Sequence, residues 1–60
     1  MKYTREQTFE LYEKLNDKWL AVEGVNIDGD ILYEGWVSID DMQEALIIIE
    51  EFDKENGIKS

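Results

Sequence analysis

Apolar residues near the start of the chain recur at the spacing of an α-helix. They fall on one narrow side of a helix when the chain turns every 3.6 residues. Thr4 precedes this run and Gln7 follows it three residues later, which is typical of a capping box. We therefore predict a first helix that begins after Thr4 and ends near Asn16 and Asp17. Its apolar residues are Phe9, Leu11, Tyr12 and Leu15.

A second helical pattern occupies the last third of the chain. Ser38 is a suitable N-cap, and Asp40 and Asp41 place negative charge at the positive end of the helix dipole. Gly57 is typical of the residue that follows a helix C-terminus. The run at 47–49 alone would also suit a strand, but the caps on both sides favour a helix. The predicted apolar face comprises Met42, Ala45, Leu46, Ile48, Ile49 and Phe52.

Between the helical segments, two runs rich in Val, Ile, Leu, Tyr and Trp flank the dipeptide Asp28–Gly29. Asp-Gly is typical of a two-residue type I′ turn, because both residues accept positive φ. We predict strands over 18–27 and 30–37, with Ile27 opposite Asp30. The expected fold is α+β, in the order helix, β-hairpin, helix (αββα), as one domain over residues 1–60. Both helices would pack on one face of the two-stranded antiparallel sheet, and a second protomer would extend the sheet through a free edge.

The predicted pairing divides the hairpin into two faces, because side chains alternate along a strand and paired residues share a face. The face expected to meet the core is mostly apolar: Leu20, Val22, Gly24, Asn26, Ile31, Tyr33, Gly35 and Val37. The other face sets large apolar side chains around two acids: Trp19, Ala21, Glu23, Val25, Ile27, Leu32, Glu34 and Trp36. Two interpretations stay open: its tryptophans tuck under the helices, or the face forms a binding or dimerisation surface. A one-residue shift at the turn would exchange the faces of one strand.

Charge narrows the range of partners. The chain has 15 acidic and 6 basic residues, for a formal net charge of −9. This charge repels nucleic-acid phosphates and anionic lipids and attracts basic protein surfaces. The longest apolar run, at 45–49, is far shorter than the about 20 residues of a membrane span. The N-terminus also lacks the apolar stretch of a signal peptide. We expect no direct nucleic-acid partner and no membrane partner.

The residue types offer little catalytic chemistry. The chain contains no His and no Cys, which excludes thiolate zinc sites and cysteine nucleophiles, and the lack of Cys fits a cytoplasmic location. Glu23 opposite Glu34 would form an acid–base pair, but a chain of 60 residues can hardly build a substrate cleft around it. Asn26, Asp28 and Asp30 alternate like the start of a calcium loop, yet the glycine required at the sixth position is missing. We predict a non-enzymatic protein without a metal or cofactor.

Rows of acidic residues on both predicted helices are the strongest functional signal. At spacings of three and four residues, neighbouring carboxylates lie about 5–6 Å apart on one helix face. The first row is Glu6, Glu10, Glu13 and Asp17, and the second is Asp40, Glu44, Glu51 and Glu55, with Ile47 filling its gap. Lys14 and Lys18 relieve only part of the repulsion. Three interpretations stay open: mimicry of the phosphates of a DNA strand, a general acidic protein-binding surface, and solubility alone.

These observations favour an inhibitor or modulator that binds a basic surface of a host protein, such as a surface built for nucleic acid. Acidic side chains would steer the encounter and aromatic side chains would anchor it. The tiny, acidic, Cys-free and aromatic-rich profile is similar to small inhibitors carried by bacteriophages and other mobile elements, a resemblance of type that rests on no motif. The alternative is a structural or assembly subunit that forms a homodimer through its hairpin. The expected partner-binding residues are Glu6, Glu10, Glu13, Asp17, Trp19, Glu23, Glu34, Trp36, Asp40, Glu44, Ile47 and Glu51.

Overall fold

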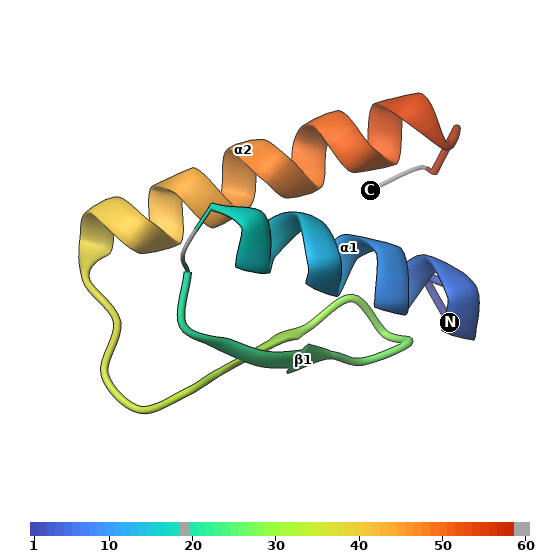
Figure 1. Cartoon of the computed structure of the whole chain (residues 1–60). Helices are drawn as coiled ribbons and strands as arrows, with labels where there is room; N and C mark the ends of the chain where they lie inside the picture. Colours follow the sequence, from blue (N-terminus) through green and yellow to red (C-terminus); the bar gives the residue numbers. More distant parts are fainter. Residues whose placement is uncertain (19, 59–60) are drawn as a thin grey trace.

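The computed structural model describes residues 1–18 and 20–58 and has the predicted αββα order (Figure 1). Its elements are α1 (Arg5–Asp17), β1 (Val22–Val25), β2 (Ile31–Tyr33) and α2 (Ile39–Glu55). α1 contacts both β1 and α2, and it lies between the hairpin and α2 in Figure 1. The α+β prediction, with both helices on one side of a two-stranded antiparallel sheet, is therefore confirmed, but only α1 contacts the sheet directly, and α2 packs on α1.

Both helices begin where the sequence predicts. The hydroxyl of Thr4 accepts a 3.1 Å hydrogen bond from the amide of Gln7, and the Gln7 side chain accepts a 2.9 Å bond from the amide of Thr4. This reciprocal pair is a complete capping box. At α2, the hydroxyl of Ser38 accepts a 3.2 Å bond from the amide of Asp41. Each cap satisfies an amide that the first helical turn leaves without an internal partner.

The C-terminus of α2 is capped by a motif that depends on a glycine at positive φ. Gly57 has φ +65°, a conformation that costs glycine little because it lacks a Cβ atom. The amide of Gly57 donates to the carbonyl of Lys54 at 3.4 Å, and the amide of Ile58 donates to that of Asp53 at 2.8 Å. These two bonds define a Schellman motif. The motif turns Ile58 back against the core, so the prediction of Gly57 as the helix stop is confirmed.

The hairpin turn differs from the predicted two-residue loop. The amide of Asn26 donates to the carbonyl of Asp30 at 3.0 Å, so residues 27–29 form a three-residue loop. Gly29 takes its last position with φ +94°, as in hairpins that follow a turn with a left-handed residue. The side-chain oxygen of Asn26 accepts bonds from the amides of Asp28 and Asp30, at 3.1 and 2.9 Å. These bonds stabilise the longer loop, so the predicted pairing was wrong by one residue.

β1 contains a second irregularity, a bulge between Val22 and Gly24. Because Glu23 is an extra residue on β1, the side-chain alternation breaks, and Val22 and Val25 both pack toward the core although they are three residues apart. The placement of Val25 on the outer face was therefore wrong, whereas Leu32 is half exposed as predicted. The paired positions are Val22 with Tyr33, Gly24 with Leu32, and Val25 with Ile31.

The core lies between α1, the hairpin and α2. Its buried members are Tyr3, Leu11, Leu15, Leu20, Val22, Ala45, Ile48 and Phe52. Three residues assigned to apolar helix faces lie outside it, because Phe9, Met42 and Leu46 are 62%, 44% and 60% exposed. Phe9 lines an open groove between α1 and β1. Met42 and Leu46 belong to the first half of α2, whose first turns extend past the end of α1 (Figure 1).

The N-terminal segment is an integral part of the core, which the sequence pattern did not reveal. Tyr3 is only 2% exposed, and its ring meets that of Phe52 edge-on with centroids 5.7 Å apart. The amides of Lys2 and Tyr3 both donate to the carbonyl of Ile27, at 2.7 and 2.9 Å. The segment therefore joins the hairpin turn to the end of α2.

Candidate protein-binding surface

The acidic row on α1 is fully displayed to solvent. Glu6, Glu10, Glu13 and Asp17 are all exposed and lie on one side of the helix. Among the described residues, the only ion pair joins Lys2 to Asp53, so no lysine or arginine of that part of the chain forms an ion pair with this row. The four carboxylates therefore keep their charge available to a partner.

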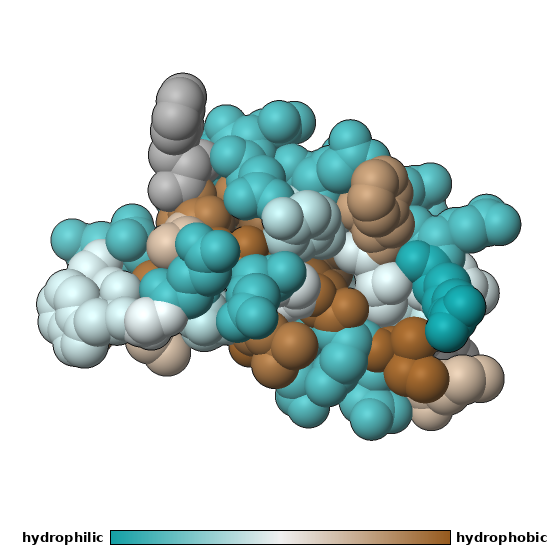
Figure 2. Space-filling model, turned by 60° about the horizontal axis from the view of Figure 1, so that its bottom comes forward, coloured by the Kyte–Doolittle hydropathy of each residue, from teal (hydrophilic) through white to brown (hydrophobic). Residues whose placement is uncertain are grey.

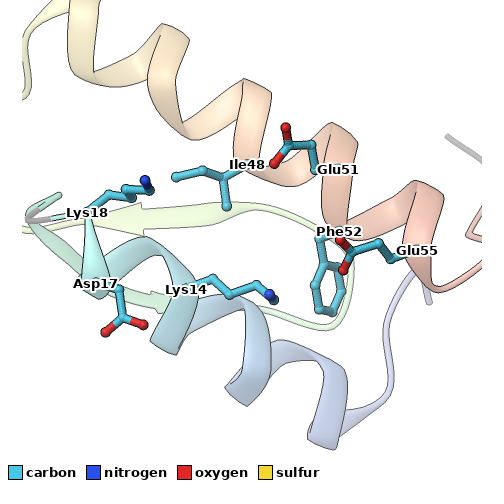
Figure 3. A pocket seen from close by; sticks show the side chains of 7 residues that line it. All are labelled: Lys14, Asp17, Lys18, Ile48, Glu51, Phe52 and Glu55. Carbon is cyan, nitrogen blue, oxygen red and sulfur yellow. The ribbon is translucent and has the colours of Figure 1, made fainter.

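Two residues of the acidic row on α2, Glu51 and Glu55, line a groove against α1 (Figure 3). The groove has a volume of about 230 Å³. Lys14 and Lys18 line its α1 side, and Glu51 and Glu55 line its α2 side. The remaining lining residues are Asp17, Ile48 and Phe52. Lys14 and Lys18 therefore lie between Glu51 and Glu55 on one side and the α1 row on the other, so the two rows do not merge into one continuous anionic surface.

The rest of the predicted α2 row lies in the first half of that helix. Asp40 and Glu44 are exposed, and Ile47 is 52% exposed. The structure therefore leaves all of these side chains accessible. It brings only Glu51 and Glu55 of the row together with the α1 lysines.

The outer side of the hairpin is exposed, as predicted, but its residues pair in a different register from the predicted one. The amide of Glu34 donates to the carbonyl of Ala21 at 2.8 Å, which places Glu34 across from Ala21. Glu23 is the extra residue of the bulge. The predicted direct opposition of Glu23 and Glu34 was therefore wrong, because both the loop length and the bulge shift the register. Both glutamates remain exposed.

Large apolar side chains do reach the surface around the hairpin. Trp36 is 87% exposed and follows Gly35, whose φ is +66°, and Leu32 is 50% exposed. Seen from below the view of Figure 1, the molecule shows apolar groups separated by hydrophilic ones (Figure 2). The other predicted tryptophan, Trp19, lies outside the described residues. Trp36 is thus the aromatic side chain best placed to anchor a partner.

A buried polar cluster near the chain ends was not predicted from the sequence. The hydroxyl of Tyr3 donates to Oδ1 of Asp53 at 2.7 Å, and Nζ of Lys2 lies 3.0 Å from Oδ2 of the same carboxylate. Burial, the hydrogen bond to Asp53 and the charge of Asp53 together raise the pKa of Tyr3. The one local signal was a large apolar ring directly before the helix cap, where hydrophobic staples begin. The cluster joins secondary-structure ends and forms no substrate cleft.

Comparisons of the chain with protein-family models, with curated proteins and with solved structures give no match. Within residues 1–18 and 20–58, no three acidic side chains are grouped so that they could hold a metal ion. Neither described helix has the length and apolar character that crossing a bilayer requires.

Proposed function

We propose that this protein is a non-enzymatic acidic module that binds a basic surface of another protein. The observation that carries the proposal is the α1 row of Glu6, Glu10, Glu13 and Asp17, which is exposed and outside any ion pair of the described residues. Like charges at these spacings destabilise a helix slightly. A partner that supplies positive charge would relieve this repulsion on binding.

The geometry of the row suits a partner that normally holds a nucleic-acid strand. Glu6 and Asp17 are eleven residues apart, so four charges span about 16 Å of helix. A DNA strand carries one charge per about 3.4 Å of axis, so the row offers a sparser version of the same pattern. Such a module would occupy the basic surface and act as an inhibitor or modulator of a host protein, as phage and mobile-element proteins do.

Electrostatic attraction and apolar anchoring would have separate roles. The net charge of −9 would accelerate the encounter with a basic partner at low salt. Buried aromatic contacts provide most of the affinity at protein interfaces, and Trp36 is available for this role. Binding should then weaken as salt screens the charges, over a Debye length of about 8 Å at 0.15 M.

Affinity capture from the native host, followed by mass spectrometry, tests the proposal. The test variant combines Glu6→Gln, Glu10→Gln, Glu13→Gln and Asp17→Asn. A matched control with the same change in net charge combines Asp28→Asn, Asp30→Asn, Asp41→Asn and Glu55→Gln, which are exposed and outside the expected partner-binding residues. We expect the test variant and high salt to abolish capture of the main partner, and the control to retain it. If the amount of captured partner changes neither with salt nor with the α1 substitutions, the proposal is refuted.

A second candidate is an assembly subunit that self-associates through its hairpin. The exposure of Leu32 and Trp36 on that side favours it, because exposed apolar groups mark interaction sites. The bulge in β1 acts against it, since bulges disrupt pairing along a strand edge. Sedimentation equilibrium separates the two candidates: a 7.1 kDa species at every concentration excludes self-association.

A further inference from the structure

α2 carries a second apolar stripe that lies mostly outside the core, and only its half-buried member Ile49 is among the residues packed against the core. Ile39, Met42 and Leu46 are 74%, 44% and 60% exposed, and the half-buried Ile49 continues the stripe. Their spacing of three, four and three residues is that of the a and d positions of a heptad. The core instead uses Ala45, Ile48 and Phe52. We call the four residues from Ile39 to Ile49 the α2 seam.

The seam lies away from the contacts that α2 makes inside the protein. Of the helices and strands in the described part of the chain, α1 alone packs against α2. The groove between them is lined on the α2 side by Ile48 and Phe52, with Glu51 and Glu55 at its rim (Figure 3). On a helical projection Glu51 and Glu55 lie to one side of the core face of α2, and the seam lies to the other side. Ile49 touches the core at one edge of the seam, whereas the exposed Ile39, Met42 and Leu46 form a helix face without a partner in the described part of the chain.

The residues beside the seam define how a partner would approach it. With Ile39 at position a, the e positions are Gln43 and Glu50, which are exposed, and the g positions are Ala45 and Phe52, which are buried. Because the g positions are covered by the core, a partner helix can approach the seam only from the side of Gln43 and Glu50. At that side it meets Glu50, so a basic residue at the facing position would form an interhelical ion pair.

Charge decides between a second copy of this chain and a different protein. The exposed charged side chains of α2 comprise one basic residue, Lys54, and six acidic ones: Asp40, Asp41, Glu44, Glu50, Glu51 and Glu55. Two copies would bring these acids and two net charges of −9 together, which opposes association. A basic helix would be attracted by the same charges.

We propose that the α2 seam binds an amphipathic basic helix, with apolar residues packed on Ile39, Met42, Leu46 and Ile49 and a lysine or arginine opposite Glu50. This proposal rests on the proposed function for the basic character of the partner, and it adds the secondary structure and the site of contact. The seam spans ten residue steps, or about 15 Å. The partner helix therefore needs about two heptads of apolar residues.

The probe is a synthetic three-heptad peptide with Leu at a and d, Lys at e and g, and Ala and Gln elsewhere. Repulsion between its lysines limits its association with itself. Fluorescence anisotropy should show the peptide binding to the protein. Met42→Gln combined with Leu46→Gln should weaken binding by about tenfold or more, because both apolar contacts are lost. Both side chains are exposed, and circular dichroism verifies that the fold is retained.

Phe9→Gln is the matched control, because Phe9 is a 62% exposed apolar residue that lies on α1, outside the seam. It should change the affinity by less than about twofold. Glu50→Lys should weaken binding of the lysine peptide and improve binding of a peptide with Glu at e and g. Equal affinity of the seam variant and the wild type for the lysine peptide would overturn the proposal.

Two further outcomes separate this inference from the proposed function. If the seam variant loses the peptide and also loses the captured host partner, the seam is the partner site. If it still captures that partner while the α1 variant does not, the proposed function stands and the seam proposal fails. A wild-type dimer that Leu46→Gln dissociates in sedimentation equilibrium would assign the seam to a second copy and overturn the basic-helix proposal.

Discussion

The hydroxyl of Tyr3 donates a 2.7 Å hydrogen bond to the carboxylate of Asp53, fifty residues further along the chain. Lys2 pairs with the other oxygen of that carboxylate at 3.0 Å and also lies over the Tyr3 ring, 5.3 Å from its centroid. Asp53 is 7% exposed, so both of its partners are needed to compensate its burial. This cluster fixes the N-terminal segment against α2.

Tyr3→Phe should lower the free energy of unfolding by about 1–3 kcal/mol, because it leaves one oxygen of the buried Asp53 without its hydrogen bond. A single core of this size supplies only about 3–5 kcal/mol, so the loss should be easily visible. Urea denaturation followed by circular dichroism measures it. Tyr12→Phe, in a half-buried tyrosine of α1 outside this cluster, is the control and should change little.

Stability should fall at alkaline pH. Burial raises the pKa of both Tyr3 and Tyr33 above the ordinary value of about 10. Below pH 10 these phenols are neutral in the folded and unfolded states, and their contribution to stability is fully present. Above pH 10 the unfolded state releases protons first, so the free energy of unfolding decreases as pH rises.

Urea denaturation at pH 8 to 11 tests this dependence. Tyr3→Phe should give a shallower decline above pH 10 than the wild type, and adding Tyr33→Phe should flatten it further. Identical slopes for wild type and double variant would show that neither phenol is responsible.

Gly29 should be much less tolerant of substitution than Gly24. A Cβ atom at Gly29 would lie 2.7 Å from Cδ of Lys2, and φ there is +94°, whereas Gly24 has no atom within 4 Å of that position. Gly29→Ala should cost about 1–3 kcal/mol through backbone strain. Gly24→Ala should remain near wild type. Thermal unfolding of both variants provides the comparison, and equal losses would contradict the three-residue loop.

Two acids of the α1 row should have opposite effects on stability. Glu6 is in the first turn of α1, where negative charge is favourable, and Asp17 is the last residue of the helix, where it is unfavourable. Asp17→Asn should raise the free energy of unfolding by about 0.3–1 kcal/mol at low salt, and Glu6→Gln should lower it by a similar amount. Repeating the urea titrations in 1 M salt should remove most of both differences, because salt screens them.

Local chemistry made the helix ends predictable from the sequence. The caps at Thr4 and Ser38 and the stop at Gly57 depend on residues within a few positions, and all three are confirmed. The position of the hairpin in the sequence was predictable, but the pairing of residues across its two strands was not. Whether Gly29 is the second or third loop residue depends on the side chain of Asn26, which accepts two backbone amides. Asp-Gly alone does not distinguish the two loops.

Features that depend on distant parts of the chain could not be predicted. Phe9 and Leu11 both fit the apolar spacing of α1, yet Leu11 is buried and Phe9 is 62% exposed. The difference depends on where the hairpin and α2 dock, which the helix pattern does not contain. From the sequence, Asp53 cannot be distinguished from the exposed acids of α2. Only the fold shows that it is buried and accepts a hydrogen bond from Tyr3. For the candidate surface, the sequence indicated the exposed acids of α1, but Lys14 and Lys18 were placed in the groove only by the packing of the helices.

The joining of Tyr3 to the last turns of α2 has a consequence for synthesis. Tyr3 and Asp53 are fifty residues apart, so their contact cannot form until α2 has been synthesised. Closure of so long a loop is entropically costly and slows folding relative to local contacts. The contact between Tyr3 and Asp53 should therefore be among the last to form, after the local contacts of α1 and the hairpin.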